Sequence, residues 1–361
     1  MQPLVYTSDI EVVADEEAQL TREIVEQMGA SARCAYERHR HALRDAHAKS
    51  NGILKGELVV HDGLPPELRQ GIFATPRTFT VVARLSSAPG DIHSDKIPAP
   101  RGFAIKLIDV PGERLTPDIK GSNQDFLMVN FPALAFGTIP KYKLMLSLLE
   151  ANAQAPDTFQ RLVAGTAHGA KQLLEALGGT PGATLEGLAR DNHHPLGETY
   201  HTQAAIRFGD HVAKLALRPL SDSVRALTGR SVPHVEYATM RDAVTAHFAQ
   251  SGAEYELSAQ LCVDLARMPV EDASVTWLEE LSPHRPIATL RFAPQATANP
   301  ARLVYGDDVL SFNPWNGVVA HRPLGGIMRI RRAAYERSTA FRHTLNARPR
   351  VEPSQAADIP D

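Results

Sequence analysis

The stretch that decides the fold class is TFTVVARLSS, residues 78–87. It is short and rich in Val, Thr and Phe, and clusters of Pro and Gly separate it from its neighbours, which is typical of a β-strand. Three further segments between residues 50 and 130 have the same character: ILKGELVV (53–60), GFAIKLIDV (102–110) and DFLMVNF (125–131). Together they predict an antiparallel sheet that can close into a barrel.

Helical sequence flanks these strands. Residues 16–48 contain few breakers and predict one or two helices that end near His47, before a turn at Asn51-Gly52. Helical composition returns at residues 140–190, most clearly at 141–151 and 159–177. A second set of strand candidates follows at TQAAIRFG (202–209), HVAKLALRP (211–219), YELSAQLCVDL (255–265) and IATLRFAP (287–294). We therefore expect an α+β fold in which helices surround an antiparallel β-barrel.

The chain is expected to divide into three parts. Residues 1–48 form an N-terminal helical arm, residues 49–345 form the barrel domain with its helices, and residues 346–361 form a loose polar tail.

Composition excludes several classes of protein. The 361 residues carry a formal net charge of -3, which gives no general attraction to nucleic acid or to an anionic membrane. The two cysteines cannot form a disulfide framework, so a reducing cytoplasm is expected. The first 20 residues carry acids where a secretory signal would have basic residues, so no signal peptide is expected there, and no segment approaches the roughly 20 apolar residues of a membrane-spanning helix.

The segment RRAAYERSTAFR, residues 331–342, predicts a helix with a chemically unusual stripe. One face carries polar side chains at steps of four, three and four: Arg331, Tyr335, Ser338 and Arg342. The adjoining stripe should face the core: Ile327, Ile330, Ala334 and Phe341. The far side should face water: Arg332, Glu336 and Thr339. The Arg-Tyr stripe therefore borders the buried face and requires a polar or anionic partner.

Tyr335 is a candidate metal ligand. A phenol has a pKa of about 10, so it binds a metal only where a cation stabilises the phenolate. Arg331, one turn earlier on the same stripe, is placed to do this, and tyrosine is one of the few proximal ligands of haem. Arg342 could then neutralise a haem propionate. From this helix alone, an equally good interpretation is a half-buried helix whose arginine stems cover the edge of a core.

His47 and Asn123 are weaker candidates when taken singly. In RDAHAKSNG (44–52), His47 should lie where a helix leads into the first strand of the sheet. Asn123 follows Gly121 in KGSNQDF (120–126), where an Asn usually serves a turn. A structural role is the simpler interpretation of each residue alone.

In their order along the chain, these motifs resemble the haem catalase family, and in particular its short, single-domain branch of catalase-like peroxidases. RDAHAKSNG, TVVARLSS, APRGFAIKL, GSN at 121–123 and the helix of residues 331–342 are each similar to a family segment, and the match runs with gaps from about residue 44 to 342. The resemblance implies a catalase-type barrel that binds haem b (iron protoporphyrin IX). It implies three catalytic residues: His47 as distal acid and base, Asn123, which positions the peroxide, and Ser86 behind the histidine. It further implies Tyr335 as the iron ligand and five cofactor-binding residues: Arg44, Arg84, Arg331, Arg342 and Phe136.

The chemistry implied by the resemblance is cleavage of hydrogen peroxide or an organic hydroperoxide at ferric haem, with a small organic reductant as a further partner. A homo-oligomer is compatible with it. The chain lacks the long N-terminal arm and the C-terminal extension of large catalases, and Ala46 precedes His47 where those enzymes typically carry valine. These departures favour a peroxidase with a loose substrate choice.

Three alternatives remain open from the sequence. They are a fatty-acid hydroperoxide isomerase of the allene-oxide-synthase type, a haem carrier or sensor without turnover, and a metal-free barrel that binds small apolar ligands. Neither of the last two requires His47 and Asn123, which favours an enzyme.

Overall fold

An antiparallel barrel dominates the computed structural model, which describes residues 2–88, 90–96, 99–119, 121–151, 192–232 and 235–361. The strands are β1 Lys49–Val60, β2 Thr78–Ser87, β3 Arg101–Leu107, β4 Gln124–Val129, β5 Tyr200–His201, β6 Ile206–Phe208, β7 His211–Pro219, β8 Ala253–Leu261 and β9 Arg285–Phe292. Their order is β5-β4-β3-β2-β1-β9-β8-β7-β6. Because β5 pairs with both β4 and β7, eight strands close into a ring, and β6 pairs with β7 outside it.

The two faces of β2 separate the core of the barrel from the candidate site. Side chains alternate between the faces of a strand. Val81, Ala83 and Leu85 join the large apolar cluster inside the barrel. Arg84 and Ser86 therefore point outward, toward the helices. The composition of residues 78–87 predicted the strand correctly over its full length.

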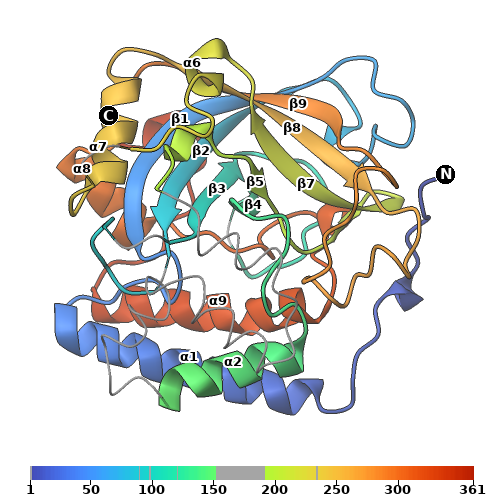
Figure 1. Ribbon diagram of the computed structural model, residues 1–361, viewed down its shortest axis with the longest axis horizontal. Helices are drawn as coiled ribbons and strands as arrows, with labels where there is room; N and C mark the ends of the chain where they lie inside the picture. The colour runs from blue at the N-terminus through green and yellow to red at the C-terminus, as the bar shows by residue number, and fades with distance from the viewer. Residues whose placement is uncertain (1, 89, 97–98, 120, 152–191, 233–234) are drawn as a thin grey trace.

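Helices lie around the barrel (Figure 1). Their bounds are α1 Glu17–His39, α2 Ile139–Ala151, α6 Asp222–Arg225, α7 Thr239–Phe248, α8 Pro300–Val304 and α9 Gly326–Leu345. Helices α1, α2 and α9 lie together as a layer below the barrel (Figure 1). Ile24 of α1, Ile139 of α2 and Ile330 of α9 pack in one apolar cluster. The α+β barrel with surrounding helices is thus confirmed.

Two local predictions were wrong. Helix α1 ends at His39, well before His47, because Arg40 adopts the left-handed conformation (φ 54°) and donates its N–H to Tyr36 O as a helix cap. The turn expected at Asn51-Gly52 is a bulge inside β1, where the pairing with β2 shifts between Ser50 and Gly52. The helix predicted at 141–151 is confirmed as part of α2, whereas 159–177 lies outside the described residues.

The C-terminal segment also differs from the loose polar tail that was expected. Glu352 pairs with the buried Lys106 of β3 at 2.8 Å, and Ile359 is 1% exposed in an apolar cluster with Val82. Only a few side chains of this segment are buried, and exposed polar residues separate them, so the composition of the segment does not reveal that it is anchored.

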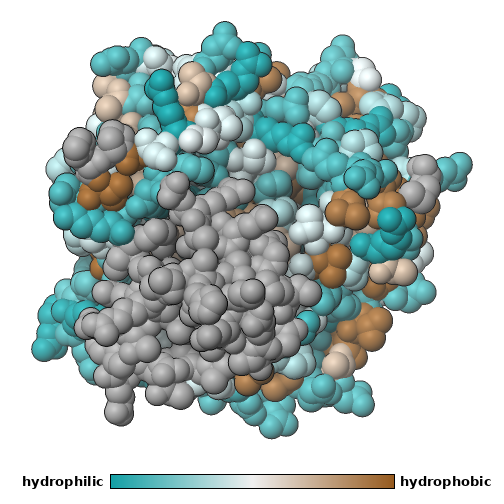
Figure 2. Space-filling view, viewed as in Figure 1, coloured by the Kyte–Doolittle hydropathy of each residue, from teal (hydrophilic) through white to brown (hydrophobic). Residues whose placement is uncertain are grey.

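The visible face of the molecule is mainly hydrophilic, with separate hydrophobic patches (Figure 2). Over the residues that the structure describes, every helix is too short or too polar to traverse a lipid bilayer.

Candidate active site

His47 lies in the loop between α1 and β1, on the outer face of the barrel wall. Its backbone is left-handed, with φ 52°, which is uncommon for a residue with a side chain and is found more often at functional sites. The ring Nδ1 lies 3.3 Å from Ser86 Oγ of β2. The loop and the strand thus fix the orientation of the imidazole together.

Gly102 of β3 provides the space for this ring. A Cβ at residue 102 would lie 2.7 Å from both His47 Nδ1 and Ser86 Oγ. Since β2 and β3 pair Ser86 with Gly102, the close approach is built into the register of the sheet. Only glycine, which has no Cβ, leaves room for the His47 ring beside residue 102 of β3.

The imidazole of His47 is held neutral. Burial is the largest cause that lowers its pKa, and the positive charges of Arg84, Arg331 and Arg101 act in the same direction, which brings the pKa to about 4. His47 as a whole residue is only partly buried. His47 is therefore a proton acceptor at neutral pH.

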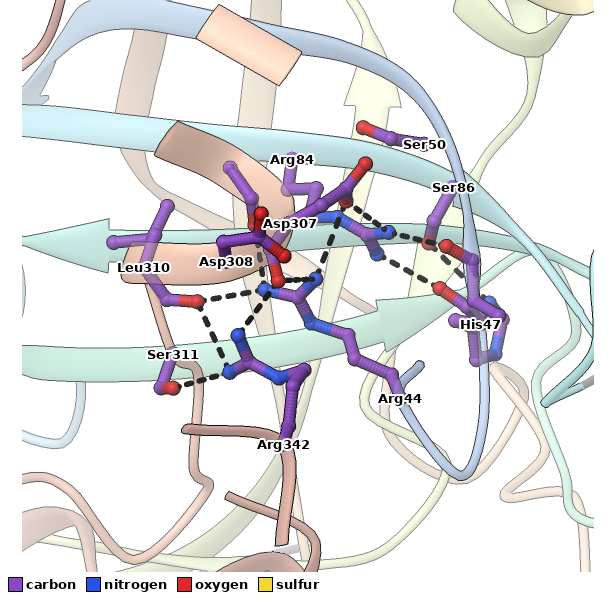
Figure 3. A network of polar contacts seen from close by, with 12 residues as sticks. Arg44, His47, Ser50, Arg84, Ser86, Asp307, Asp308, Leu310, Ser311 and Arg342 are labelled. Carbon is purple, nitrogen blue, oxygen red and sulfur yellow. Dashed lines mark hydrogen bonds and ion pairs between the residues drawn. The ribbon is translucent and has the colours of Figure 1, made fainter. Parts of the chain in front are cut away.

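Three arginines from separate elements converge beside His47 (Figure 3). Arg84 of β2 donates to the carbonyls of His47 at 2.9 Å and Ala48 at 3.0 Å, which holds the loop against the strand. Arg44 comes from the same loop, and Arg342 comes from the C-terminal half of α9. Their guanidiniums meet around Asp307, and we call Arg44, Arg84 and Arg342 the arginine cradle.

The end of a short helical segment supplies the acceptors of the cradle. Helix α8 continues into a π turn at Tyr305–Val309, whose final carbonyls have no partner within the helix. Arg44 Nη2 donates to Gly306 O at 2.6 Å and to Leu310 O at 2.7 Å. Arg342 donates to Asp307 O and to Ser311 Oγ, each at 2.6 Å. Arg84 Nε, by contrast, is buried without a hydrogen-bond partner.

Helix α9 turns its polar stripe toward the loop of His47. Ser338 Oγ accepts the backbone N–H of Asp45 at 3.4 Å, and Arg331 is close enough to lower the pKa of His47. Tyr335 is partly buried on the same stripe. Arg331 donates to Met328 Sδ at 3.5 Å. The polar stripe therefore meets the loop of residues 44–47 at Ser338 and the end of the π turn at Arg342.

Asn123 is not brought to His47. Its amide donates to Glu352 Oε2 and to Pro353 O, each at 3.0 Å. Along β3, His47 contacts Gly102, whereas Leu107 at the other end pairs with the residue that follows Asn123. Five residues of strand span roughly 17 Å at about 3.3 Å per residue. Phe136 is buried, in the segment that leads into α2.

Three residues of this site were not predicted from the sequence: Arg101, Tyr142 and Asp307. Arg101 precedes Gly102 in the APRGFAIKL segment and donates to Ser87 Oγ at 2.6 Å and Asn192 Oδ1 at 2.8 Å. Tyr142 of α2 lies near Tyr335 and Arg331, and burial raises the pKa of its phenol. An aromatic residue at the start of a predicted helix was a weak signal for Tyr142. Nothing in the sequence indicated Asp307.

The solved structures that this chain resembles include three catalases. A fungal catalase is 16% identical, with a TM-score of 0.58 over 87% of this chain and 61% of its own. Catalase A from Saccharomyces cerevisiae is 14% identical, with a TM-score of 0.56 over 88% of this chain and 66% of its own. A bacterial catalase is 14% identical, with a TM-score of 0.55 over 97% and 67%.

The chain has the catalase fold. It spans 61% of the length of the fungal catalase, and at such low identity the likeness concerns the fold. No protein-family model and no curated protein matches the sequence. In this catalase-fold chain, His47, Ser86, Arg44 and Arg84 occupy one outer side of the barrel, facing the helix that carries Tyr335 and Arg342.

Proposed function

We propose that this catalase-fold protein is a haem-dependent oxidoreductase that acts on hydrogen peroxide or organic hydroperoxides, with peroxidase turnover favoured. The observation that carries the proposal is the arginine cradle beside a neutral His47, joined through Arg342 to the helix of Tyr335. A cation cluster suits the propionates of haem, and a phenol on the facing helix suits its iron.

The chemistry of the side chains fits such a cofactor. Arg84 Nε is an unpartnered buried donor in the cradle. Arg44 and Arg84 share the Asp307 carboxylate, whereas Arg342 donates to the main-chain oxygen of Asp307. Arg44, Arg84 and Arg342 would hold the propionates, Tyr335 would bind the iron, and Arg331 would favour the ionised phenol. Haem bound there would supply ferric iron, at which the O–O bond of a peroxide can be cleaved.

His47 performs the proton transfers in this proposal. With the proton on Nδ1 donated to Ser86 Oγ, Nε2 is left as the acceptor of a peroxide proton, which it can return to the leaving oxygen. Ser86 fixes the orientation of the ring. A role for Asn123 in positioning the peroxide stays a prediction, because its amide would have to leave Glu352 and Pro353.

The purified protein reconstituted with haem provides the test. We expect an intense Soret band, together with oxidation of an added dye by hydrogen peroxide that exceeds the release of oxygen. Strong oxygen release without dye oxidation would show catalase turnover instead. A bound pigment that consumes no peroxide would show a haem carrier, and conversion of a fatty-acid hydroperoxide without a reductant would show an isomerase.

Gly102→Ala tests whether the position of the His47 ring beside β3 matters for turnover. The added methyl group has to displace the imidazole or Ser86 Oγ, since both lie 2.7 Å away. We expect peroxide turnover to fall by about tenfold or more, because small displacements of a catalytic group are costly. Haem absorbance should persist, and thermal melting should show only the modest loss of about 1–3 kcal/mol typical of overpacking. Unchanged turnover would mean that the position of His47 is irrelevant.

A further inference from the structure

Asp307 places a carboxylate among the three arginines of the cradle. Its Oδ1 accepts from Arg84 Nη2 at 3.1 Å and from Arg44 Nη1 at 3.3 Å (Figure 3). Its side chain is 36% exposed, whereas that of Arg84 is 3% exposed. The carboxylate therefore approaches the buried guanidiniums from the more open side, and it can withdraw without unpacking the barrel wall.

The cradle carries excess positive charge even with Asp307 in place. Arg44 and Arg84 share this one carboxylate, and Arg342 bonds uncharged oxygens of Asp307 and Ser311. The neighbouring Asp308 directs Oδ1 to His41 Nε2 at 2.7 Å and to Asn346 Nδ2 at 3.2 Å. Burial and the charges of Arg84 and Arg342 hold the pKa of Arg44 well below its usual value. A buried, incompletely neutralised cluster of guanidiniums favours an added anion.

We propose that Asp307 is an internal counter-anion of the cradle: it neutralises Arg44 and Arg84 in the free protein and gives way when a ligand carboxylate binds there. The proposal rests on the proposed function only in naming a haem propionate as that carboxylate. The main-chain oxygens of residues 306, 307 and 310 keep Arg44 and Arg342 in place throughout the exchange.

As part of the chain, Asp307 competes with a ligand carboxylate for the arginine cradle, and this has two effects. Asp307 lowers the apparent affinity of the cradle for any carboxylate ligand, because the ligand binds only the fraction of molecules in which the cradle is free. Asp307 also stabilises the ligand-free protein, because without it the buried guanidiniums of Arg44 and Arg84 lack a carboxylate partner.

Asp307→Asn is the test variant, and Asp308→Asn is its matched control. Both variants remove one negative charge at adjacent residues, but only the first removes a direct bond to the cradle. The probes are iron-free protoporphyrin IX, its dimethyl ester and inorganic sulfate, so that no readout depends on iron or on turnover. Affinity is measured by fluorescence titration, and stability by thermal melting at low salt with and without sulfate.

We expect Asp307→Asn to bind protoporphyrin IX about tenfold or more tightly than the wild type, the change expected when one charge-assisted competitor is lost. Its affinity for the dimethyl ester should be unchanged. Its melting temperature should fall at low salt and recover with sulfate by more than that of the wild type. Asp308→Asn should show neither the gain in affinity nor the larger sulfate response.

Equal or weaker binding of protoporphyrin IX by Asp307→Asn would overturn the proposal, since Asp307 would then be a fixed support for the arginines. If the wild type binds no porphyrin, the proposed function fails, and the melting data alone decide the role of Asp307. In that case, equal sulfate responses in the wild type and in Asp307→Asn would refute the counter-anion, and a larger response in the variant would support it.

Discussion

Tyr335→Phe is expected to abolish stable haem binding while leaving the barrel folded. Phenylalanine preserves the ring that packs on α9 but removes the only atom of residue 335 that can bind iron. Because loss of a mere supporting partner costs about 10- to 100-fold in metal affinity, loss of the ligand itself should cost at least about 100-fold. Titration with haem, followed at the Soret band, measures the affinity, and thermal melting of the haem-free protein checks the fold.

Tyr142→Phe is the matched control for this experiment. Tyr142 is a second phenol close to Arg331 and Tyr335, but it comes from α2 and is buried enough to have a raised pKa. We expect Tyr142→Phe to retain haem. If instead Tyr142→Phe loses the pigment and Tyr335→Phe keeps it, the phenol that binds iron is Tyr142, and the assignment of Tyr335 is wrong.

His47→Gln is expected to lose peroxide turnover by about 100- to 10,000-fold, the usual contribution of a positioned general acid and base. Glutamine approximates the size of the imidazole but cannot exchange protons near neutral pH. Haem content and the Soret band should match those of the wild type, because His47 contacts the arginine cradle through its main-chain oxygen, which the substitution retains. Peroxide consumption per haem measures the effect, and an undiminished rate would remove His47 from the mechanism.

The pH dependence of turnover offers an independent readout for His47. Its pKa is lowered to about 4, so the imidazole is neutral above that pH and protonated below it. Since only the neutral ring accepts a proton, wild-type turnover should be constant down to about pH 5 and fall as the pH drops through 4. The residual activity of His47→Gln should not show this decrease at acid pH. The same decrease in both proteins would assign the titration to another group.

Local composition predicted the strands well. Residues 78–87 form β2 as expected, and 211–219 form β7, because their apolar residues suit a wall that is buried on both faces over most of its length. Helix α9 was also predictable, with Ile327, Ile330 and Ala334 buried along one stripe. The end of α1 was not, because the left-handed cap at Arg40 leaves no distinctive residue in the sequence.

Within the candidate site, sequence reasoning predicted His47, Ser86 and the three arginines as neighbours, and the structure brings these five together. It also placed Asn123 with them, where the structure does not. The amide of Asn123 is taken by the C-terminal segment, since the buried ammonium group of Lys106, which also pairs with Asp125, attracts Glu352 beside it. A polar segment at the end of the chain gave no sign of this anchoring role.

The antiparallel strands and the amphipathic helix of Tyr335 could be predicted from the amino-acid order alone, and so could the types of side chain in the site. Strand and helix formation depend on periodicity and composition, which are properties of a few neighbouring residues. Only the tertiary structure decided which charges meet. Asp307 lies 263 residues from Arg44 and 223 from Arg84, and their bonds exist because the closed barrel and the π turn bring distant backbone segments together. Electrostatic neutralisation depends on distance in space, which no local pattern encodes.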